Sequence, residues 1–552
     1  MSTKKKVILY VIVTVIALVY LFLETPNLNP LYPDGAMFWC VLITVYIVIG
    51  MLGNFKFKLN LNQTGGSIQS PVSIDKTGKL KKIPLIVIGV LWLALIAVHI
   101  GSLPLFHVTA YREQLTKPQI REFSSDIQAI DTSQIPIVDQ ALATKLADKK
   151  LGEKPALGSQ VRLGEPTIQQ VNGKLVWVVP LHHSGFFKWL SNMDGTPGYI
   201  MVSATDMQDV TYVDTPKVKI HPDAFLMDKL TRRVRLGAGM FTGITDYSFE
   251  LDESGQPYYV VTTYKNLRGF ALPEATGVIL VNATDGSMER YALEDVPEWV
   301  DRIQPEDFIM TQINNRGKYI HGIFNFSNYE KFQASAHDVI VYNNGNCYLF
   351  TGITSVGSDD SAIGLMMVDM RTKEVIQYNV SGATEGAAMS SAEGKVQDLG
   401  YVATSPILLN IQGQPTYFMT LKDGEGLVKQ YAFVSVKSYD QVGVGVTMDE
   451  ANRNYIKVLD TGTSTVIPEE EQETVTGKVV RIAGEYDGSQ VQYSFMIDSR
   501  PNMIFEAASE LSAELPLTRE GDEVSVTFTK VDSGVVKATA FDNLQFTQDA
   551  GQ

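Results

Sequence analysis

The chain has 552 residues, with 46 Lys and Arg against 61 Asp and Glu, and a formal net charge of −15. At this length a single hydrophobic core is insufficient, so several domains are expected. An apolar fraction of 45% excludes a disordered chain. A mean hydropathy of +0.01 is high for a strongly acidic protein, which indicates that apolar and acidic parts of the chain are separated.

Three apolar stretches account for the high mean hydropathy: Val7–Leu23, Ala36–Leu52 and Ile83–Phe106. The first two contain no charged residue, and the third contains only His99. At about 1.5 Å per residue, each crosses or nearly crosses a hydrocarbon layer of roughly 30 Å, which predicts three transmembrane helices. For the first stretch a cleaved signal peptide is the alternative. Its length, and the absence of a small-x-small cleavage site after Glu24, favour a retained helix.

Lysines flank these stretches unevenly. Lys4, Lys5 and Lys6 precede the first stretch, and six further lysines lie between the second and third, whereas the loop 24–35 has neither Lys nor Arg. The positive-inside rule then predicts a cytoplasmic N-terminus and an extracytoplasmic region after about residue 107. Residues 1–101 carry a net charge of +6, which leaves −21 for the rest of the chain.

The two cysteines lie in different regions. Cys40 falls in the second apolar stretch and Cys347 in the outer region, so an intramolecular disulfide is not expected. A large exported region without disulfides favours a bacterial cytoplasmic membrane and cell envelope over a eukaryotic cell surface.

The outer region contains an internal repeat. In each copy a Gly-containing turn opens an aromatic strand, and a second apolar strand follows; the four pairs are Asn172–Pro180 with Gly198–Asp206, Ser254–Val261 with Gly277–Asp285, Asn344–Phe350 with Gly364–Asp369, and Gln412–Met419 with Tyr431–Val436. A helical pattern precedes each pair, at Pro136–Lys150, Pro222–Arg235, Pro305–Ile313 and Ser390–Leu399, the last opening with a capping box of Ser390 and Glu393. Each copy is therefore expected to be α+β, one helix covering one face of an antiparallel meander.

The predicted domains follow from these patterns. They are a membrane anchor (1–106), a linker (107–133), repeat 1 (134–213), repeat 2 (222–293), repeat 3 (305–380), repeat 4 (388–445), a helix with an acidic linker (446–473) and a small β-barrel (474–547).

The repeat unit, with its helix, its Gly-x-x-aromatic strand and the strand end Val281–Gly286, resembles the PepSY-like domains of bacterial envelope proteins and protease propeptides. The resemblance covers about 134–445 and implies a binding or regulatory scaffold without catalytic residues. The insertions Lys188–Pro197 and Lys265–Thr276 depart from the compact PepSY-like pattern. The whole layout is similar to large uncharacterised membrane proteins of Gram-positive bacteria and their mobile elements, a similarity that implies no activity.

The C-terminal part begins with a capping box, Thr447 to Glu450, for a helix that runs to about Leu459, followed by the acidic linker Ile467–Glu473. Five strands are then expected at Val475–Ile482, Val491–Ile497, Met503–Ala507, Glu523–Thr529 and Gly534–Phe541, with a helix at 508–514. This order is that of an OB-like barrel; a generic small barrel or half-sandwich is the alternative. Phe495, Phe505 and Phe528 could stack bases or fill the barrel core, but a net charge of −5 over 474–547 disfavours nucleic acid.

Catalytic motifs such as His-Glu-x-x-His, Gly-x-Ser-x-Gly and the Walker loop are absent from the sequence. His182 and His183 are adjacent on a predicted strand, so they point to opposite faces and do not readily share a metal ion. The segment 73–76 matches Ser-x-x-Lys formally, but it lies in a predicted cytoplasmic loop. The acidic pairs 252–253 and 359–360 lack the ligand spacing of a calcium loop. No catalytic residue, cofactor or metal is predicted.

One aromatic segment stands out as a candidate partner contact: Phe186, Phe187, Lys188 and Trp189. It could also anchor the chain in the headgroup zone of a membrane, while core packing of Phe186 and Trp189 is the favoured alternative. We expect a non-enzymatic, membrane-anchored envelope protein that presents a repeat scaffold for protein or cell-wall contacts. The alternatives are a PepSY-like regulator or inhibitor of an envelope protease, and single-strand nucleic-acid binding through the barrel.

Overall fold

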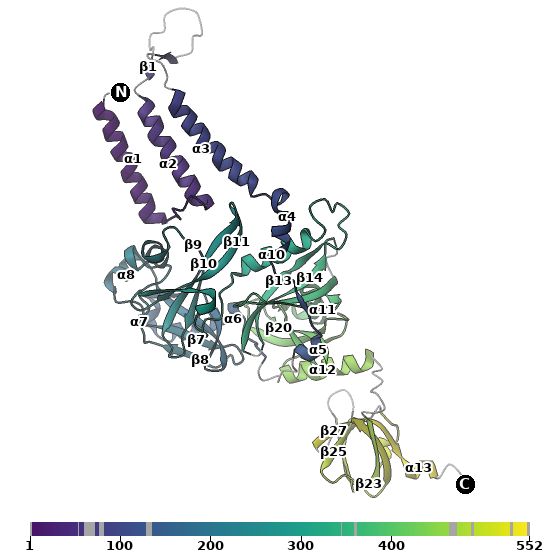
Figure 1. The fold of residues 1–552 in the computed structure, drawn as a ribbon. Coiled ribbons are helices and arrows are strands. Elements are labelled where there is room, and N and C mark those ends of the chain that lie inside the picture. Colours follow the sequence, from purple (N-terminus) through teal and green to yellow (C-terminus); the bar gives the residue numbers. More distant parts are fainter. Residues whose placement is uncertain are drawn as a thin grey trace, which may run out of the picture. The chain divides into compact units, whose positions relative to one another are not determined.

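The computed structural model describes residues 3–52, 55–59, 72–76, 82–127, 135–343, 345–357, 361–462, 472–486, 491–509, 511–529 and 534–548. The chain divides into two compact units, Met1–Val458 and Leu459–Gln552 (Figure 1). The first unit holds three apolar helices and four antiparallel sheets, and the second holds a closed barrel. Most of the acidic linker expected at Ile467–Glu473 lies outside the described residues.

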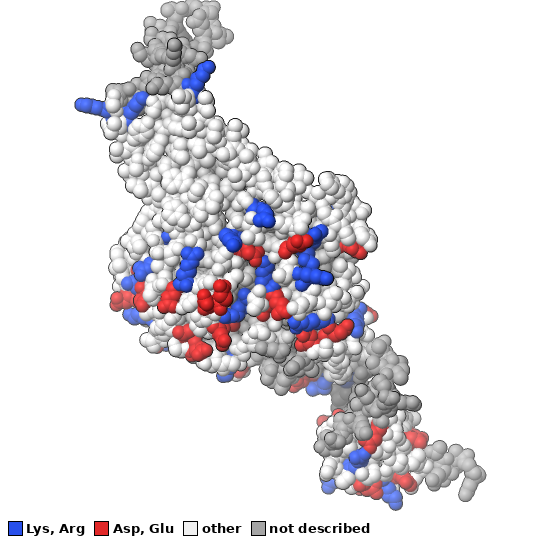
Figure 2. Space-filling model, viewed as in Figure 1, with Lys and Arg blue, Asp and Glu red and all other residues white. Residues whose placement is uncertain are grey.

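Three helices are long and apolar enough to cross a membrane: α1 (Thr3–Glu24), α2 (Pro33–Met51) and α3 (Lys82–Gly101). Their side chains are largely exposed and apolar, and in Figure 2 these helices are almost free of charge. A short hairpin of β1 (Phe55–Leu59) and β2 (Val72–Lys76) lies between α2 and α3. The expectation that the third helix extends to Phe106 is wrong: α3 ends at Gly101, and Pro104 starts the separate helix α4 (Pro104–Glu113).

Four larger sheets follow in chain order, with their main strands in 161–213, 243–292, 332–383 and 402–445, and we name the parts of the chain that hold them repeats 1 to 4. Repeat 1 contains β4 (Val161–Leu163), β5 (Thr167–Val171), β6 (Lys174–His183), β7 (Tyr199–Ser203) and β8 (Val210–Val213). Repeat 2 contains β9 (Gly243–Leu251), β10 (Pro257–Arg268), β11 (Ala271–Asn282) and β12 (Met288–Ala292).

Repeats 3 and 4 complete the series, and repeat 4 has the strand order of repeat 1. Repeat 3 contains β13 (Phe332–Asn343), β14 (Asn346–Ser355), β15 (Ser361–Asp369), β16 (Val375–Tyr378) and β17 (Gly382–Ala383), and β3 (Gln119–Ile120) from the region expected to be a linker pairs with β16. Repeat 4 contains β18 (Val402–Ala403), β19 (Ile407–Ile411), β20 (Gln414–Lys422), β21 (Val428–Ser435) and β22 (Val442–Gly445).

One hydrogen-bond pattern recurs in all four repeats. The residue that follows β7, β11, β15 or β21 accepts hydrogen bonds from the segment before the repeat's helix; these residues are Ala204, Ala283, Met370 and Val436. The backbone N–H of each donates to a carbonyl near the start of the neighbouring strand, which is β6, β10, β14 or β20. The strand end that recurs in the sequence therefore joins the helical segment to the sheet in every copy.

The helices differ from the predicted ones at their ends. The structure has α6 (Gln140–Gly152) capped by Asp139, α9 (Leu230–Val234), α10 (Glu306–Lys318) and α11 (Glu385–Lys395). The expected start at Ser390 is wrong, because Thr384 caps α11 through the N–H of Ala387. Glu393 instead accepts a hydrogen bond from the N–H of Ala403. The helix expected at Pro222–Arg235 is reduced to α9, between short 3-10 and π turns.

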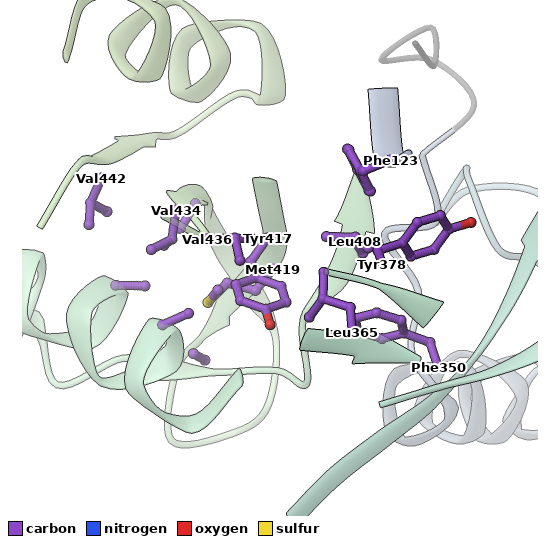
Figure 3. Packing of buried hydrophobic residues seen from close by; sticks show 14 of the residues in the cluster. Phe123, Phe350, Leu365, Tyr378, Leu408, Tyr417, Met419, Val434, Val436 and Val442 are labelled. Atoms are coloured by element: carbon purple, nitrogen blue, oxygen red, sulfur yellow. The ribbon is translucent and has the colours of Figure 1, made fainter. Parts of the chain in front are cut away.

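Contacts join each repeat to the next. A shared apolar core connects repeats 1 and 2, and the ion pair of Lys373 with Glu274 connects repeats 2 and 3. A second apolar core, which includes Phe350 and Tyr417 and packs on α11, joins repeats 3 and 4 (Figure 3). Lys422 of repeat 4 then binds Asp139 at the start of α6 at 2.6 Å, so repeat 4 also contacts repeat 1. The four repeats thus form a closed ring.

The insertion Lys265–Thr276 forms the tip of the long hairpin of β10 and β11, which extends to the end of α3 (Figure 1). The backbone N–H of Phe270 donates to Ser102 Oγ at 2.9 Å, and its ring packs edge-on against His99. The departure from a compact repeat therefore has a role, since it fixes the ring to the helices.

The second compact unit contains β23 (Gln472–Tyr486), β24 (Val491–Ile497), β25 (Met503–Ala508), β26 (Glu523–Thr529) and β27 (Gly534–Asn543). They close in the order β23-β24-β25-β27-β26, with β25 and β27 parallel. The expectation of a helix at 508–514 is wrong, because the described residues of this range form none. A one-turn 3-10 helix follows at Leu515–Leu517. Before the barrel, α12 (Met448–Gly462) starts with Thr447 Oγ1 accepting from the N–H of Glu450. A short helix, α13 (Leu544–Gln548), follows the barrel.

Candidate functional site

A cavity of about 620 Å³ lies at the centre of the ring. One edge strand of each sheet lines it, through Thr167 and Ile168 of β5, Asp246–Phe249 of β9, Asp338–Asn343 of β13 and Ile407–Asn410 of β19. Each of these strands is at the edge of its sheet and pairs with one neighbouring strand only. An edge strand carries backbone donors and acceptors that the sheet does not use. We call this space the central cavity.

The wall of the central cavity is acidic. Asp246, Glu306 and Asp338 line it together with Arg302, which forms an ion pair with Glu306. Burial raises the pKa of Glu306, and the charges of Asp338 and Asp246 raise it further, against the effect of Arg302. Arg302 Nε is buried and has no hydrogen-bond partner among the described residues. This wall therefore favours a cationic group over an anionic one.

Two irregular strands carry two of these acids. Asp246 is the extra residue of a β-bulge in β9 and has a φ of 52°, in the left-handed region. Asp338 directly follows a register shift in β13. Bulges re-aim side chains and often lie next to functional sites. Acids are also rare in strand interiors, and this is the one signal in the sequence that could have identified these two residues.

A histidine cluster forms another part of the same wall. His182 Nδ1 lies 2.8 Å from Asp223 Oδ2, and His182 Nε2 lies 2.9 Å from the hydroxyl of Tyr259. The hydrogen bond from His182 lowers the pKa of Asp223 to about 2, and burial raises the pKa of Tyr259 far above 10. Tyr259 therefore donates to Nε2, and Nδ1–H donates to the Asp223 carboxylate. Arg162 completes the series with an ion pair to Asp223 at 2.5 Å.

His183 and His221 extend this cluster. His183 Nδ1 is 3.0 Å from His221 Nε2, and the ring of His221 also stacks on that of His182. Burial, with the two neighbouring histidines, lowers the pKa of His221 to about 2, and burial lowers that of His183. His182 and His183 thus point to different faces, as their spacing predicts. No pattern in the sequence predicts that His221, 38 residues after His183, contacts both.

The cluster can be tested for metal binding by its geometry. Ligand atoms of His182, His221 and Asp223 lie within 4.8 Å of one another, which is compatible with a shared ion. However, the two imidazole rings are stacked at 4.5 Å with an angle of 12° between their planes. The lone pair of a ring nitrogen lies in the ring plane, so two nearly parallel rings do not direct both lone pairs at one ion. We therefore interpret the cluster as a buried hydrogen-bond network rather than a metal site.

The candidate partner segment divides into buried and exposed residues. It forms the short helix α8 (Phe186–Ser191). Trp189 is 2% exposed, and its Nε1 donates to the buried Asp228 at 3.1 Å, whereas Phe187 is 80% exposed and Lys188 is also exposed. Phe186 is partly exposed and packs on Phe225. Core packing holds for Trp189, and Phe187 remains available for a contact.

The other sequence candidates fall elsewhere. The motif 73–76 forms β2, of which only the backbone is described. Asp252 Oδ1 accepts from the N–H groups of Ser254 and Gln256, as in an ordinary turn, and the pair 359–360 lies outside the described residues. Phe495, Phe505 and Phe528 are buried in the barrel core, which leaves none of these three rings free to stack on a base.

Two further carboxyl groups lie buried beside the cavity wall. Glu250 accepts hydrogen bonds from Ser248 Oγ at 2.6 Å and from the N–H of Asp301 at 3.0 Å. Burial, with the nearby charge of Asp301, raises the pKa of Glu250 to about 8. Asp301 in turn accepts from the hydroxyl of Tyr342 at 2.9 Å. Glu250 is therefore protonated at neutral pH.

Comparison with known proteins identifies no family. No family model matches the chain, and no curated protein matches it. Among solved structures, a levansucrase variant of B. megaterium has a TM-score of 0.19 and 10% identity, covering 78% of this chain and 93% of that one. Synechocystis apocarotenoid oxygenase has a TM-score of 0.14 and 10% identity, covering 49% of this chain and 47% of that one. Similarities this weak carry no argument about fold or activity.

Proposed function

We propose that the protein is a non-enzymatic, membrane-anchored envelope protein whose ring of four repeats binds a segment of a partner protein or a cell-wall polymer in the central cavity. The convergence of four edge strands on one cavity carries this proposal. It offers a single ligand backbone hydrogen bonds and side chains from every repeat. A cavity of this volume also falls within the range of ligand-binding sites.

The chemistry of the wall selects among ligands. Extended peptides bind edge strands through main-chain hydrogen bonds, with specificity from the neighbouring side chains. Asp246, Glu306 and Asp338 outnumber Arg302, so the preferred segment carries a Lys, Arg or amine group. Apolar side chains such as Ile168, Phe249 and Leu408 complete the lining and suit the aliphatic part of such a group.

The proposed location is the outer face of a bacterial cytoplasmic membrane, with the N-terminus in the cytoplasm. The lysines at the ends of α1 and α3 that lie away from the ring support it (Figure 2). A reporter fused after Gln552 tests it: activity of an enzyme that folds only outside the cytoplasm is expected, and cytoplasmic activity alone would contradict the orientation.

Two finer assignments belong to this proposal. The PepSY-like resemblance of the repeats leaves regulation of an envelope protease as the alternative, in which the bound segment belongs to the protease. The strand order of the C-terminal barrel supports an OB-like fold. Its acidic charge and buried phenylalanines disfavour single-stranded nucleic acid as its ligand.

The test measures binding of extended oligolysine and oligoglutamate peptides to the full chain in detergent. Oligolysine is expected to bind, and Asp246→Asn or Glu306→Gln to weaken it about tenfold, which corresponds to about 1.4 kcal/mol. Glu253→Gln is the matched control, since it removes one charge from an exposed turn. Equal binding of both peptides, or equal effects of the three variants, would refute the cavity as the site.

A further inference from the structure

A second cavity, of about 410 Å³, lies where α1 meets the ring. Phe22 and Leu23 of the last turn of α1 line one side, and Phe225 and Leu226, shortly before α9, line another. Lys229 and Arg232 add cationic side chains to this partly apolar lining. We call it the membrane-side cavity, because one wall is the end of a helix long and apolar enough to cross a membrane.

Arg232 is held in this wall without a negative partner. It is 5% exposed, and its guanidinium donates to the carbonyls of Phe22 and Leu226, both at 2.6 Å, and of Leu23 at 3.3 Å. The guanidinium also lies 4.3 Å from the centre of the Phe22 ring. Within the part of the chain that the structure describes, no carboxylate forms an ion pair with it, and Glu24 at the end of α1 is exposed. The guanidinium therefore has hydrogen-bond acceptors, but no carboxylate among the described residues neutralises its charge.

The remaining charges do not compensate for it. Lys229 is half-buried and forms no ion pair among the described residues. Asp223 is the one carboxylate among the described lining residues, and Arg162 and His182 already bind it. A buried charge is costly unless it is paired. The cavity therefore has an excess of positive charge beside an apolar surface.

We propose that the membrane-side cavity binds the headgroup of an anionic phospholipid from the leaflet next to the ring. The phosphate lies beside Lys229 and Arg232, and the acyl chains follow the apolar surface of α1. The position at the end of a membrane helix supplies the lipid, and the exposed Phe186, Phe187 and Leu226 near the rim suit the interfacial zone. This inference is independent of the ligand proposed for the central cavity.

A free anion shares the phosphate chemistry but not the apolar half of the site. Inorganic phosphate would contact the cationic side chains but leave the apolar lining from Phe22, Leu23 and Phe225 uncovered. A phospholipid contacts both parts of the cavity. Arg232 also joins α1 to the ring, so its binding of a headgroup would place the lipid at the junction of the two.

The experiment uses the full chain in detergent, stripped of lipid, with phosphatidylglycerol or phosphatidylcholine added back, and counts bound lipid by native mass spectrometry. Retention of phosphatidylglycerol is expected to be at least tenfold higher, and Lys229→Gln to reduce it about tenfold. Arg233→Gln is the matched control, because Arg233 lies on α9 beside Arg232 but hydrogen-bonds Gly286 instead. Arg232→Gln removes the buried charge of the membrane-side cavity. If Arg232→Gln fails to fold, Lys229→Gln still tests the inference.

Three outcomes would overturn the inference. Equal retention of the two lipids would show that charge does not select the ligand. An unchanged affinity in Lys229→Gln, or an equal loss in Arg233→Gln, would place the lipid elsewhere. Displacement of phosphatidylglycerol by inorganic phosphate at equal concentration would assign the cavity to a free anion. Oligolysine binding in the same preparations reports separately on the central cavity.

Discussion

The two cavities of the membrane-anchored unit have opposite charge. The central cavity is lined by acids of repeats 2 and 3 and by Arg302. The membrane-side cavity is lined by cationic side chains and by one carboxylate, Asp223, which is already paired with Arg162. The histidine cluster lies between them, with His182 lining the first and His183 the second. Because His183 and His221 are kept neutral by burial, the wall that separates the cavities adds no charge through these two side chains. Under the two proposals, the same ring binds two ligands of opposite sign.

The difference between the cavities also follows from position. One edge strand of every repeat reaches the central cavity, so this cavity is a product of the repeated fold. The membrane-side cavity depends on features found in single repeats: α8 of repeat 1, the segment before α9 of repeat 2, and the end of α1. The repeat thus forms the common site, and the insertions form the membrane junction.

The largest expected effect comes from reversing the charge of the central cavity. Asp338→Lys replaces an acid near Glu306 with a cation, which removes one attraction for a bound cationic group and adds one repulsion. Oligolysine affinity is expected to fall at least 100-fold, with retention of phosphatidylglycerol unchanged. Titration of both ligands on one preparation measures this. A parallel loss of both ligands would mean that the two cavities are not independent.

The next effect concerns stability rather than binding. The folded chain keeps a proton on Glu250 that the unfolded chain releases above about pH 4.5, since the folded pKa is about 8. The free energy of unfolding therefore falls as pH rises between these values, by about 1.4 kcal/mol per unit. Glu250→Gln cannot ionise and is expected to remove about 2 to 3 kcal/mol of this fall between pH 5.5 and 7.5.

Denaturant unfolding at the two pH values checks the Glu250 prediction, with Glu253→Gln as an exposed control. An identical pH dependence in Glu250→Gln and in the unsubstituted chain would show that water reaches this carboxyl group. Glu250 would then be ionised at neutral pH and would add to the negative charge beside the central cavity.

Much of this architecture is predictable from the sequence, because it rests on local patterns. The apolar stretches predict α1 to α3, and the recurring Gly turn and strand end predict a sheet in each of the four ranges. The helix ends are less predictable: Ser390 and Glu393 have the spacing of a capping box, but the pairing of Ala383 with Val436 places the helix start at Thr384. Tertiary hydrogen bonds override the local signal there.

The site is much less predictable, since its members are far apart in the chain. Asp246 and Asp338 belong to different repeats, and Arg302 lies in the segment between them. His182 was recognisable as a polar residue of interest, but its partners Asp223 and Tyr259 depend on the packing of repeat 1 against repeat 2. A sequence pattern within one repeat cannot contain this information.

A smaller effect separates the cavities by their response to pH. Burial, with Asp338 and Asp246, raises the pKa of Glu306, so this carboxyl gains a proton earlier than usual as pH falls. Oligolysine affinity is expected to fall severalfold from pH 7.5 to 5, and less in Glu306→Gln. Glu306 does not line the membrane-side cavity, so retention of phosphatidylglycerol should not change. A lipid affinity that follows pH as the peptide affinity does would point to a shared titrating group.

The smallest effect is expected at the rim of the membrane-side cavity. Phe187→Ser replaces an exposed ring and should change stability by less than about 0.5 kcal/mol, as is usual for surface substitutions. Trp189→Phe, two residues away, leaves the buried Asp228 without its donor and should cost about 1 to 3 kcal/mol. Denaturant unfolding of both variants gives the contrast. If Phe187→Ser destabilised the protein as much as Trp189→Phe, Phe187 would have to be covered by a partner or by lipid, and the segment Phe186–Trp189 would be an interface rather than an exposed rim.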